Sequence, residues 1–239
     1  MEISMNQTQH WDTWNSKYRD LDATQSLDEA CKRRMQEVLR AIAQLDLRGS
    51  RLLEVGCGTG WLSSKLTAFG QVAAVDLGKE IIDAAKERHP EIDFRSGDIH
   101  SVDFEPGSFD AIVTLETFSH VPDQAAFVRR LSQLLKPNGS LLLTTQNKWV
   151  FERKAGIGPA VGYTRQWVDV KTLKRLLQPQ FSICSLTTLE PDGHLGVLKV
   201  VNSRKVNRVV SSMLGKARIK RLKEQAGFGQ TIFVTCKKK

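Results

Sequence analysis

Three closely spaced glycines, Gly56, Gly58 and Gly60, form the pattern with the clearest chemical meaning in this sequence. They follow an apolar segment that begins at Leu52 and precede a segment with helical spacing. Glycine lets a backbone turn sharply and lets a ligand approach without a Cβ in the way. Asp76 comes 20 residues after Gly56, at the end of the next apolar segment, where a carboxylate can accept hydrogen bonds from two ribose hydroxyls. The pattern predicts a nucleoside site; the alternative is an ordinary strand-to-helix turn.

The glycine spacing also separates two classes of nucleoside cofactor. A dinucleotide fingerprint requires G-x-G-x-x-G, whereas Trp61 directly follows Gly60 in this chain. The spacing therefore disfavours NAD and FAD.

His120 is the side chain best suited to take a proton from a substrate. It follows the apolar segment 109–115 by a few residues, in a stretch that should open at the ligand-binding edge of a sheet. A general base works best with a pKa near neutrality, and the ordinary pKa of histidine is ~6.5. In the alternative interpretation His120 caps the helix that starts near Pro122, or only contacts a cofactor. Glu116 adds a carboxylate nearby, acting through its side chain or only through its backbone carbonyl.

Short apolar segments alternate with amphipathic ones up to about residue 181, which is typical of βαβ units around a parallel sheet. We expect strands at 51–56, 72–76, 92–95, 109–115, 140–145, 181–189 and 231–236. We expect helices at 61–69, 79–88, 123–135 and 168–177, after an N-terminal helical cap that contains Trp11, Trp14 and Tyr18 and then a second helix over 27–45. Pro137-Asn138-Gly139 predicts a stop and a turn. Residues 147–165 should form a loop over the carboxyl edge of the sheet.

Ordered blocks between Leu52 and Gln146 resemble the class I S-adenosyl-L-methionine (SAM)-dependent methyltransferases, in particular the ubiquinone and menaquinone biosynthesis type. The blocks are Glu54-Val55-Gly56-Cys57-Gly58-Thr59-Gly60, Ala74-Val75-Asp76-Leu77, Ser96-Gly97-Asp98-Ile99, Phe109-Asp110-Ala111-Ile112-Val113, His120-Val121-Pro122-Asp123 and Leu135-Lys136-Pro137-Asn138-Gly139. A weaker similarity covers residues 163–181. Several blocks in the same order are more specific than one glycine loop.

The resemblance implies a cofactor, SAM, whose product is S-adenosyl-L-homocysteine (SAH), and a role for each matching residue. The implied cofactor-binding residues are Glu54, Gly56, Cys57, Gly58, Gly60, Asp76, Leu77, Asp98, Ile99 and Glu116. The glycine loop would cradle the methionine end, with Glu54 orienting the loop and the amino group, and Asp76 would hold the ribose. Leu77, Asp98 and the Ile99 backbone would recognise the adenine. The alternatives are core packing for Leu77 and a local Asx turn for Asp98.

At two positions the sequence differs from related methyltransferases, and these differences bear on the need for a metal and on the atom that is methylated. Related quinone-pathway enzymes often carry Glu-His where this chain has Ser119-His120, so we predict no metal. The chain reads Leu115-Glu116-Thr117-Phe118 where base-amine methyltransferases carry an Asn/Asp-Pro-Pro-Tyr/Phe block. His120 and the resemblance together favour methyl transfer to oxygen.

Positive charge is concentrated at the C-terminal end of the chain. The formal net charge is +9; residues 1–190 carry 23 basic and 24 acidic residues, and residues 191–239 carry 12 and 2. Between the last two expected strands, one face of a basic amphipathic helix gathers Val206, Val209, Val210, Met213, Leu214 and Ala217. This helix packs on the domain, covers an acidic or phosphate-bearing substrate, or makes peripheral contact with an anionic membrane through residues 203–224. Nucleic-acid binding ranks lower because few aromatic side chains are interleaved with the charges.

These observations predict one α/β fold: a Rossmann-like, seven-stranded, mostly parallel sheet with helices on both faces, an N-terminal cap (1–47), a SAM-binding core (48–190) and a basic helical insertion with the final strand (191–239). The predicted activity is methyl transfer to a hydroxyl of a small aromatic, sugar or lipid-linked acceptor. The alternatives are an RNA or protein methyltransferase and a non-catalytic SAM-binding protein. We expect a cytoplasmic or membrane-peripheral protein with four reduced cysteines, because signal-peptide, membrane-span and disulfide patterns are missing. The acceptor and the oligomeric state stay open.

Overall fold

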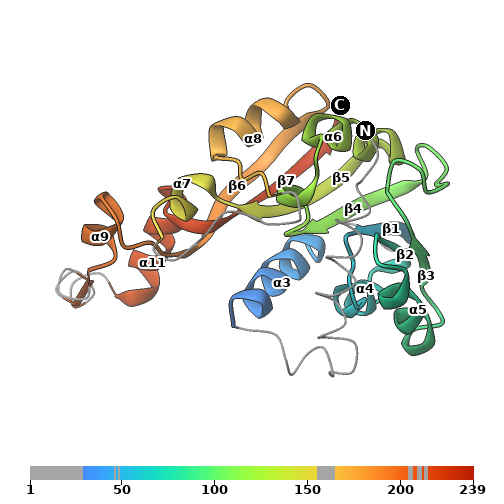
Figure 1. Ribbon diagram of the computed structural model, residues 1–239, viewed down its shortest axis with the longest axis horizontal. Coiled ribbons are helices and arrows are strands. Elements are labelled where there is room, and N and C mark those ends of the chain that lie inside the picture. Colours follow the sequence, from blue (N-terminus) through green and yellow to red (C-terminus); the bar gives the residue numbers. More distant parts are fainter. Residues whose placement is uncertain are drawn as a thin grey trace.

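The computed structural model describes residues 29–45, 47, 49–154, 165–203, 207–208, 212 and 215–239. Seven strands form one sheet in the order β3-β2-β1-β4-β5-β7-β6, and β7 alone in that sheet runs antiparallel to its neighbours. The strands are β1 (Ser50–Val55), β2 (Gly70–Asp76), β3 (Asp93–Ser96), β4 (Phe109–Leu115), β5 (Leu135–Gln146), β6 (Phe181–Pro191) and β7 (Gly229–Lys238). The predicted fold class is confirmed, as Figure 1 shows.

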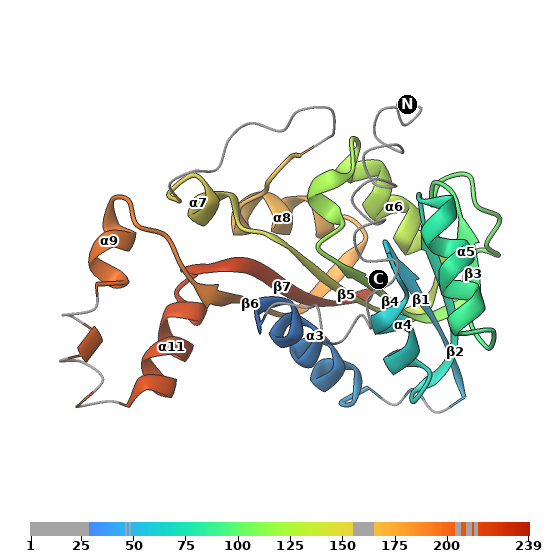
Figure 2. The same cartoon turned by 60° about the horizontal axis from the view of Figure 1, so that its bottom comes forward.

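Helices cover both faces of this sheet (Figures 1 and 2). One face packs against α3 (Glu29–Ile42), α4 (Trp61–Leu66) and α5 (Lys79–Arg88), and the other against α6 (Gln124–Leu134) and α8 (Val170–Leu177). Successive side chains of a strand point to opposite faces. Leu52 therefore packs in the same cluster as Val38 of α3, and Leu53 in the same cluster as Phe127 of α6. Burial on both faces explains why the central strands are continuously apolar.

Parallel pairing brings the carboxyl ends of β1, β2 and β4 to the same edge of the sheet. Val55 pairs with Val75, so the loops that follow β1 and β2 begin side by side. Asp110 lies at the opposite edge, where its carboxylate accepts hydrogen bonds from the Arg51 backbone N–H (2.9 Å) and from Lys136 Nζ (2.8 Å). Asp110 thus holds the strands together away from the ligand edge, in agreement with a structural role.

Several element boundaries differ from the sequence-based expectation. The expected loop 147–165 contains a short helix, α7 (Lys148–Phe151), because the Asn147 side chain accepts a hydrogen bond from the Trp149 N–H (3.2 Å) and caps it. Helix α4 ends at Leu66 rather than at residue 69. Strand β5 already pairs at Leu135, and the Pro137–Gly139 turn forms an irregularity within it, with Asn138 at φ 60°.

Within the described residues, the insertion before β7 includes the helices α9 (Val197–Val201) and α11 (Lys216–Gln225). The expected apolar face of residues 206–214 and the aromatic residues Trp11, Trp14 and Tyr18 lie outside the described residues, whereas Ala217 is exposed at the start of α11. No helix in the described part of the chain has the length and apolar character needed to cross a membrane.

Candidate active site

The glycine loop joins β1 to α4 at the carboxyl edge of the sheet. Gly56, Gly58 and Gly60 all have positive φ, at 78°, 51° and 78°. A Cβ on Gly56 would overlap the Thr117 side chain, and a Cβ on Gly60 would lie 2.6 Å from Phe94 Cζ. A Cβ on Gly58 would meet nothing within 4 Å. The first and third glycines are thus required by packing, and the middle one faces open space.

Asp76 fixes the loop from the neighbouring strand. One carboxylate oxygen accepts a hydrogen bond from the Gly58 N–H (2.9 Å), and the other from the Gly78 N–H (3.1 Å). The Gly97 N–H donates to the Asp76 carbonyl (2.8 Å), which brings the loop that contains Asp98 next to β2. The structure therefore brings together three of the sequence blocks around the end of β2.

The predicted adenine-side residues lie in different local environments. Leu77 is half-buried and belongs to neither core cluster of the described residues. Asp98 forms an Asx turn, with its carboxylate accepting from the His100 N–H (3.0 Å), as the alternative interpretation expects. Ile99 is buried in the core, and its carbonyl accepts from Arg130 Nε (3.0 Å).

The side chains of Glu54, near the end of β1, and of Cys57, within the glycine loop, are both buried. The Glu54 carboxyl is buried and accepts a hydrogen bond from the Ser63 hydroxyl of α4. Burial raises the pKa of Glu54 to about 8, with a further contribution from the Asp76 charge. Burial and the Asp76 and Glu54 carboxylates also raise the pKa of the Cys57 thiol. These contacts match a role in orienting the loop, and Cys57 is a neutral thiol rather than a nucleophile.

Glu116 and His120 follow β4 on the other side of the glycine loop. Glu116 has φ 60°, an unusual conformation for a non-glycine residue, and its N–H donates to Thr144 Oγ1 (3.0 Å). Thr117 then packs against Gly56. His120 is half-buried and ends a short 3₁₀ helix, η1 (Phe118–His120), where its N–H donates to the Thr117 carbonyl (2.9 Å).

The Glu116 carboxyl has an unsatisfied atom. Burial raises its pKa despite the nearby Arg34 guanidinium. Its Oε1 lies 3.9 Å from Arg34 Nε and has no hydrogen-bond partner within the described part of the chain. A buried acceptor without a partner is rare and calls for a ligand or water.

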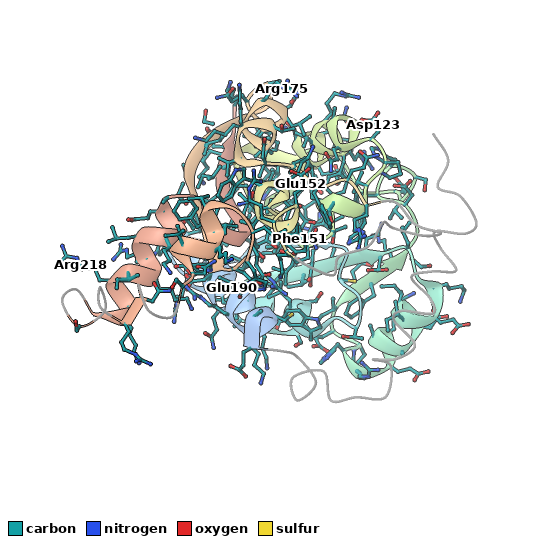
Figure 3. All side chains as sticks on the ribbon, turned by 60° about the vertical axis from the view of Figure 1, so that its left-hand side comes forward. Asp123, Phe151, Glu152, Arg175, Glu190 and Arg218 are labelled. Carbon is teal, nitrogen blue, oxygen red and sulfur yellow. The ribbon has the colours of Figure 1, made fainter. Side chains whose placement is uncertain are left out.

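Sequence reasoning missed a partly buried ionic cluster beside Glu116. Arg34 of α3 forms an ion pair with Glu190 near the end of β6 (3.1 Å), and Gln230 of β7 donates to the same carboxylate (3.1 Å). Figure 3 shows Glu190 where α3 and the C-terminal helices meet. Arg34 and Glu190 are 156 positions apart in the chain, so local spacing carried no signal for this contact.

The described residues contain no group of three or more His, Cys, Asp and Glu side chains placed to hold a metal ion. Ser119 is buried within η1. The absence of a metal stays a prediction from the sequence.

Comparison with known proteins gives the family of this domain. The model of a family described as "Methyltransferase domain" matches residues 53–143. A ubiquinone biosynthesis O-methyltransferase of Xanthomonas oryzae pv. oryzae is 42% identical over 112 residues, which cover 44% of this chain and 47% of that protein. The chain thus spans about half the length of the curated relatives it matches.

Solved structures share the fold along nearly the whole chain. The [4+2]-cyclase SpnF has a TM-score of 0.67 at 19% identity, covering 97% of this chain and 94% of its own. The N-methyltransferase NodS from Bradyrhizobium japonicum, crystallised with SAH, has a TM-score of 0.65 at 14% identity, covering 95% and 98%. At these identities the likeness concerns the fold alone. The matched family model makes residues 53–143 a methyltransferase domain, and the strand order and the sequence blocks agree with the class I SAM-dependent methyltransferases.

Proposed function

We propose that the protein transfers a methyl group from SAM to a hydroxyl of a small-molecule acceptor: a hydroxylated aromatic, a sugar or a lipid-linked intermediate. The observation that carries this proposal is the geometry of the glycine loop: the Gly58 N–H donates to the Asp76 carboxylate, and a Cβ on Gly58 would meet nothing within 4 Å. A second observation is the buried Glu116 Oε1 after β4, which has no hydrogen-bond partner among the described residues. The name of the Xanthomonas relative, ubiquinone biosynthesis O-methyltransferase, favours oxygen as the methylated atom. An acidic or lipid-linked acceptor and membrane contact through residues 203–224 are further parts of the proposal.

The residues present fit SAM. Gly58 offers a backbone surface without a Cβ in the way. Both Asp76 oxygens accept hydrogen bonds from backbone N–H groups, and a carboxylate at the end of the second strand is the group that receives two ribose hydroxyls. Leu77 is exposed enough to cover the adenine, beside Asp98 and Ile99. Glu116 offers a buried acceptor for the methionine amino group, and Arg34 next to it supplies the cation that a methionine carboxylate requires.

Besides binding SAM, the protein has to position the acceptor and remove the proton of its hydroxyl. SAM supplies a methyl group on a sulfonium, which is already activated for in-line displacement. His120 accepts the proton of the acceptor hydroxyl, and α3 and α7 exclude water from the site. This division assigns His120 to the acceptor and the glycine loop with Asp76 to the cofactor.

A catalytically different use of the fold is a second candidate. SpnF, which covers 97% of this chain, is described as a [4+2]-cyclase. The fold alone therefore does not fix the reaction. A SAM-binding protein without methyl transfer remains the alternative against which turnover is tested, as does an RNA or protein methyltransferase recruited by the basic C-terminal region.

Titration calorimetry tests cofactor binding. The parent protein should bind SAM, and Asp76→Ala should weaken binding by at least tenfold, because two hydrogen bonds to a charged group are lost. Asp83→Ala removes an exposed carboxylate on α5 and serves as the matched control. No heat from the parent protein, or equal affinity in Asp76→Ala, would contradict the proposal.

Turnover with tritium-labelled SAM and a catechol such as 3,4-dihydroxybenzoate tests the catalytic role. His120→Ala should lower kcat by about 10²-fold or more and leave SAM affinity intact. His89→Ala, which changes a histidine at the end of α5, is the control. Unchanged kcat in His120→Ala would remove this residue from the mechanism, and the absence of turnover in a SAM-binding parent across hydroxylated acceptors would favour the non-catalytic alternative.

A further inference from the structure

The most exposed large hydrophobic side chains of the described residues are concentrated in the C-terminal insertion. They are Leu195, Val197, Val200 and Leu222, with exposed fractions between 50% and 61%. Isolated exposed apolar side chains are ordinary on a protein surface, whereas a concentration of them marks an interaction site. Residues 195–200 and 215–226, which we call the basic end, are therefore candidates for contact with a partner.

The apolar side chains of the basic end are interleaved with positive charge. Five exposed cations accompany them: Lys199, Lys216, Arg218, Lys220 and Arg221. The two acidic residues of the insertion are already neutralised, because Asp192 pairs with Lys154 (2.6 Å) and Glu224 with Arg33 (2.8 Å). The basic end thus presents a net positive field with apolar groups inside it.

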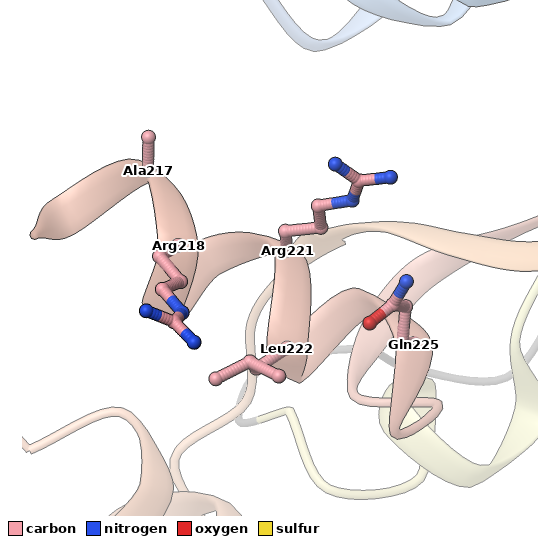
Figure 4. A pocket seen from close by; sticks show the side chains of 5 residues that line it. All are labelled: Ala217, Arg218, Arg221, Leu222 and Gln225. Carbon is pink, nitrogen blue, oxygen red and sulfur yellow. The ribbon is translucent and has the colours of Figure 1, made fainter. Parts of the chain in front are cut away.

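Helices α9 and α11 lie side by side at one end of the molecule, beyond the sheet, in both Figure 1 and Figure 2. Lys223 of α11 donates hydrogen bonds to Asn202, the residue directly after α9 (3.4 Å), and to Asn207 in the segment between the two helices (2.8 Å). Arg218 lies at the outer tip in Figure 3, and Figure 4 shows Arg218, Arg221 and Leu222 around a shallow depression on α11. A broad surface can reach these side chains without meeting the catalytic domain.

We propose that the basic end docks on an anionic lipid bilayer. Aliphatic side chains surrounded by Lys and Arg suit the boundary between headgroups and acyl chains, where apolar burial and attraction to anionic lipid add together. A nucleic acid fits less well, because stacking on bases needs exposed aromatic rings. The aromatic side chain of the described insertion, Phe228, packs against Trp149 with ring centroids 5.6 Å apart.

The basic end is hydrogen-bonded to elements that border the candidate active site. The carbonyl of Arg153, two residues after α7, accepts hydrogen bonds from the N–H groups of His194 (3.0 Å) and Leu195 (3.2 Å). Glu224 of α11 pairs with α3, and the N–H of Glu190 donates to the same carboxylate (3.1 Å). Docking would hold the carboxyl ends of β5 and β6 and the amino end of β7 next to the bilayer. The lipid-linked acceptor of the proposed function would then reach the site from the membrane; this step alone depends on the proposed function.

Vesicle sedimentation of the 239-residue chain tests the docking. At about 0.15 M salt the parent should sediment with phosphatidylcholine vesicles that contain about 30% phosphatidylglycerol and remain in solution with pure phosphatidylcholine. Arg218→Glu/Arg221→Glu should lower the partition coefficient at least tenfold, and Val197→Ser/Val200→Ser should also lower it. Lys65→Glu/Lys86→Glu makes the same charge change on exposed positions of α4 and α5 and should sediment nearly as the parent does.

The outcomes separate docking from catalysis. Equal sedimentation of the arginine variant and the lysine control, or a parent that stays in solution with anionic vesicles, would overturn the proposal. A salt-sensitive gel shift with tRNA in the absence of vesicle binding would overturn it in favour of RNA. Calorimetry with SAM should give the same affinity in all variants, which shows that they fold; loss of SAM binding in a sedimenting parent would count against the proposed function only.

Discussion

Among single residues, Gly56 is needed for packing within the protein, whereas we expect Gly58 to be needed for binding the ligand. Both have positive φ, but only Gly56 has a side chain, that of Thr117, where its Cβ would lie. Gly56→Ala should cost about 2–4 kcal/mol of unfolding free energy, from backbone strain plus overlap. Gly58→Ala should cost about 1 kcal/mol and weaken SAM binding at least tenfold, because the new methyl group enters the space that the ligand requires. Denaturant unfolding and calorimetry measure the two effects. A Gly58→Ala protein with parental SAM affinity would show that the loop is not the cofactor cradle.

Glu54 makes stability depend on pH in a predictable direction. Its pKa is about 8 in the folded protein, against an ordinary value of 4.5. The folded state therefore holds the proton more tightly, so stability from this group is present below pH 4.5 and is lost as the pH rises through about 8. Glu54→Gln does not titrate. Its unfolding free energy relative to the parent should rise between pH 5.5 and 8.5 by up to a few kcal/mol.

Urea unfolding at several pH values checks the Glu54 prediction. Glu87→Gln on the exposed side of α5 is the matched control, and its difference from the parent should not change with pH. A constant difference for Glu54→Gln as well would mean that the buried carboxyl is ionised throughout this range.

At the scale of elements, the attachment of α11 to α3 depends on a partly buried ion pair. Glu224 is nearly buried, and its partner Arg33 is about three-quarters buried. The Glu190 N–H and Arg33 both donate to Glu224. Glu224→Ala should destabilise the protein by about 1–3 kcal/mol, because a partly buried guanidinium and a backbone N–H lose their acceptor. Glu37→Ala removes the more exposed Glu37–Arg40 pair of α3 and should cost less than about 1 kcal/mol. Thermal denaturation of both variants measures the contrast, and equal losses would contradict it.

The central strands could be predicted from sequence, and the small elements could not. Strand β4 and helix α5 have the predicted limits, because a doubly covered strand and an amphipathic helix each impose a repeating pattern over several residues. Helix α7 has four residues and depends on one cap from Asn147, which is too short for a periodic signal. The Asn138 turn was recognised, but its incorporation into β5 depends on pairing with β4.

Some residues of the candidate site could likewise be predicted from the sequence, and others could not. The glycine loop and Asp76 were predicted because each belongs to a local motif with a mechanism. Arg34, Glu190 and Gln230 carry no such motif; the packing of α3 against the end of the sheet brings them to Glu116. The glycine loop and Asp76 could thus be named from the sequence, whereas the cluster around Glu116, which the proposed function assigns to the methionine end of SAM, depends on tertiary contacts.

At the scale of the whole molecule, the candidate site joins the two halves of the sheet. The glycine loop and Asp76 belong to β1 and β2, whereas Thr117, Glu116 and His120 follow β4. Thr117 packs against Gly56, and its hydroxyl donates to the Val55 carbonyl (3.3 Å) across this boundary. A ligand bound to both sides should therefore stabilise the whole fold rather than one loop.

Thermal unfolding with SAH measures this coupling. A ligand that binds only the folded state at a concentration of 100 times its Kd adds about 2.7 kcal/mol. For a chain of 239 residues this corresponds to a rise in Tm of roughly 5–10 °C. Asp76→Ala should lose most of the rise at the same SAH concentration, and Asp83→Ala should keep it. A single transition that moves as a unit would indicate that the two halves of the sheet unfold together. If only one of two separable transitions moved, SAH would be bound by one half of the sheet alone. The contact of Thr117 with the glycine loop would then not couple the half that contains β1 and β2 to the half that contains β4.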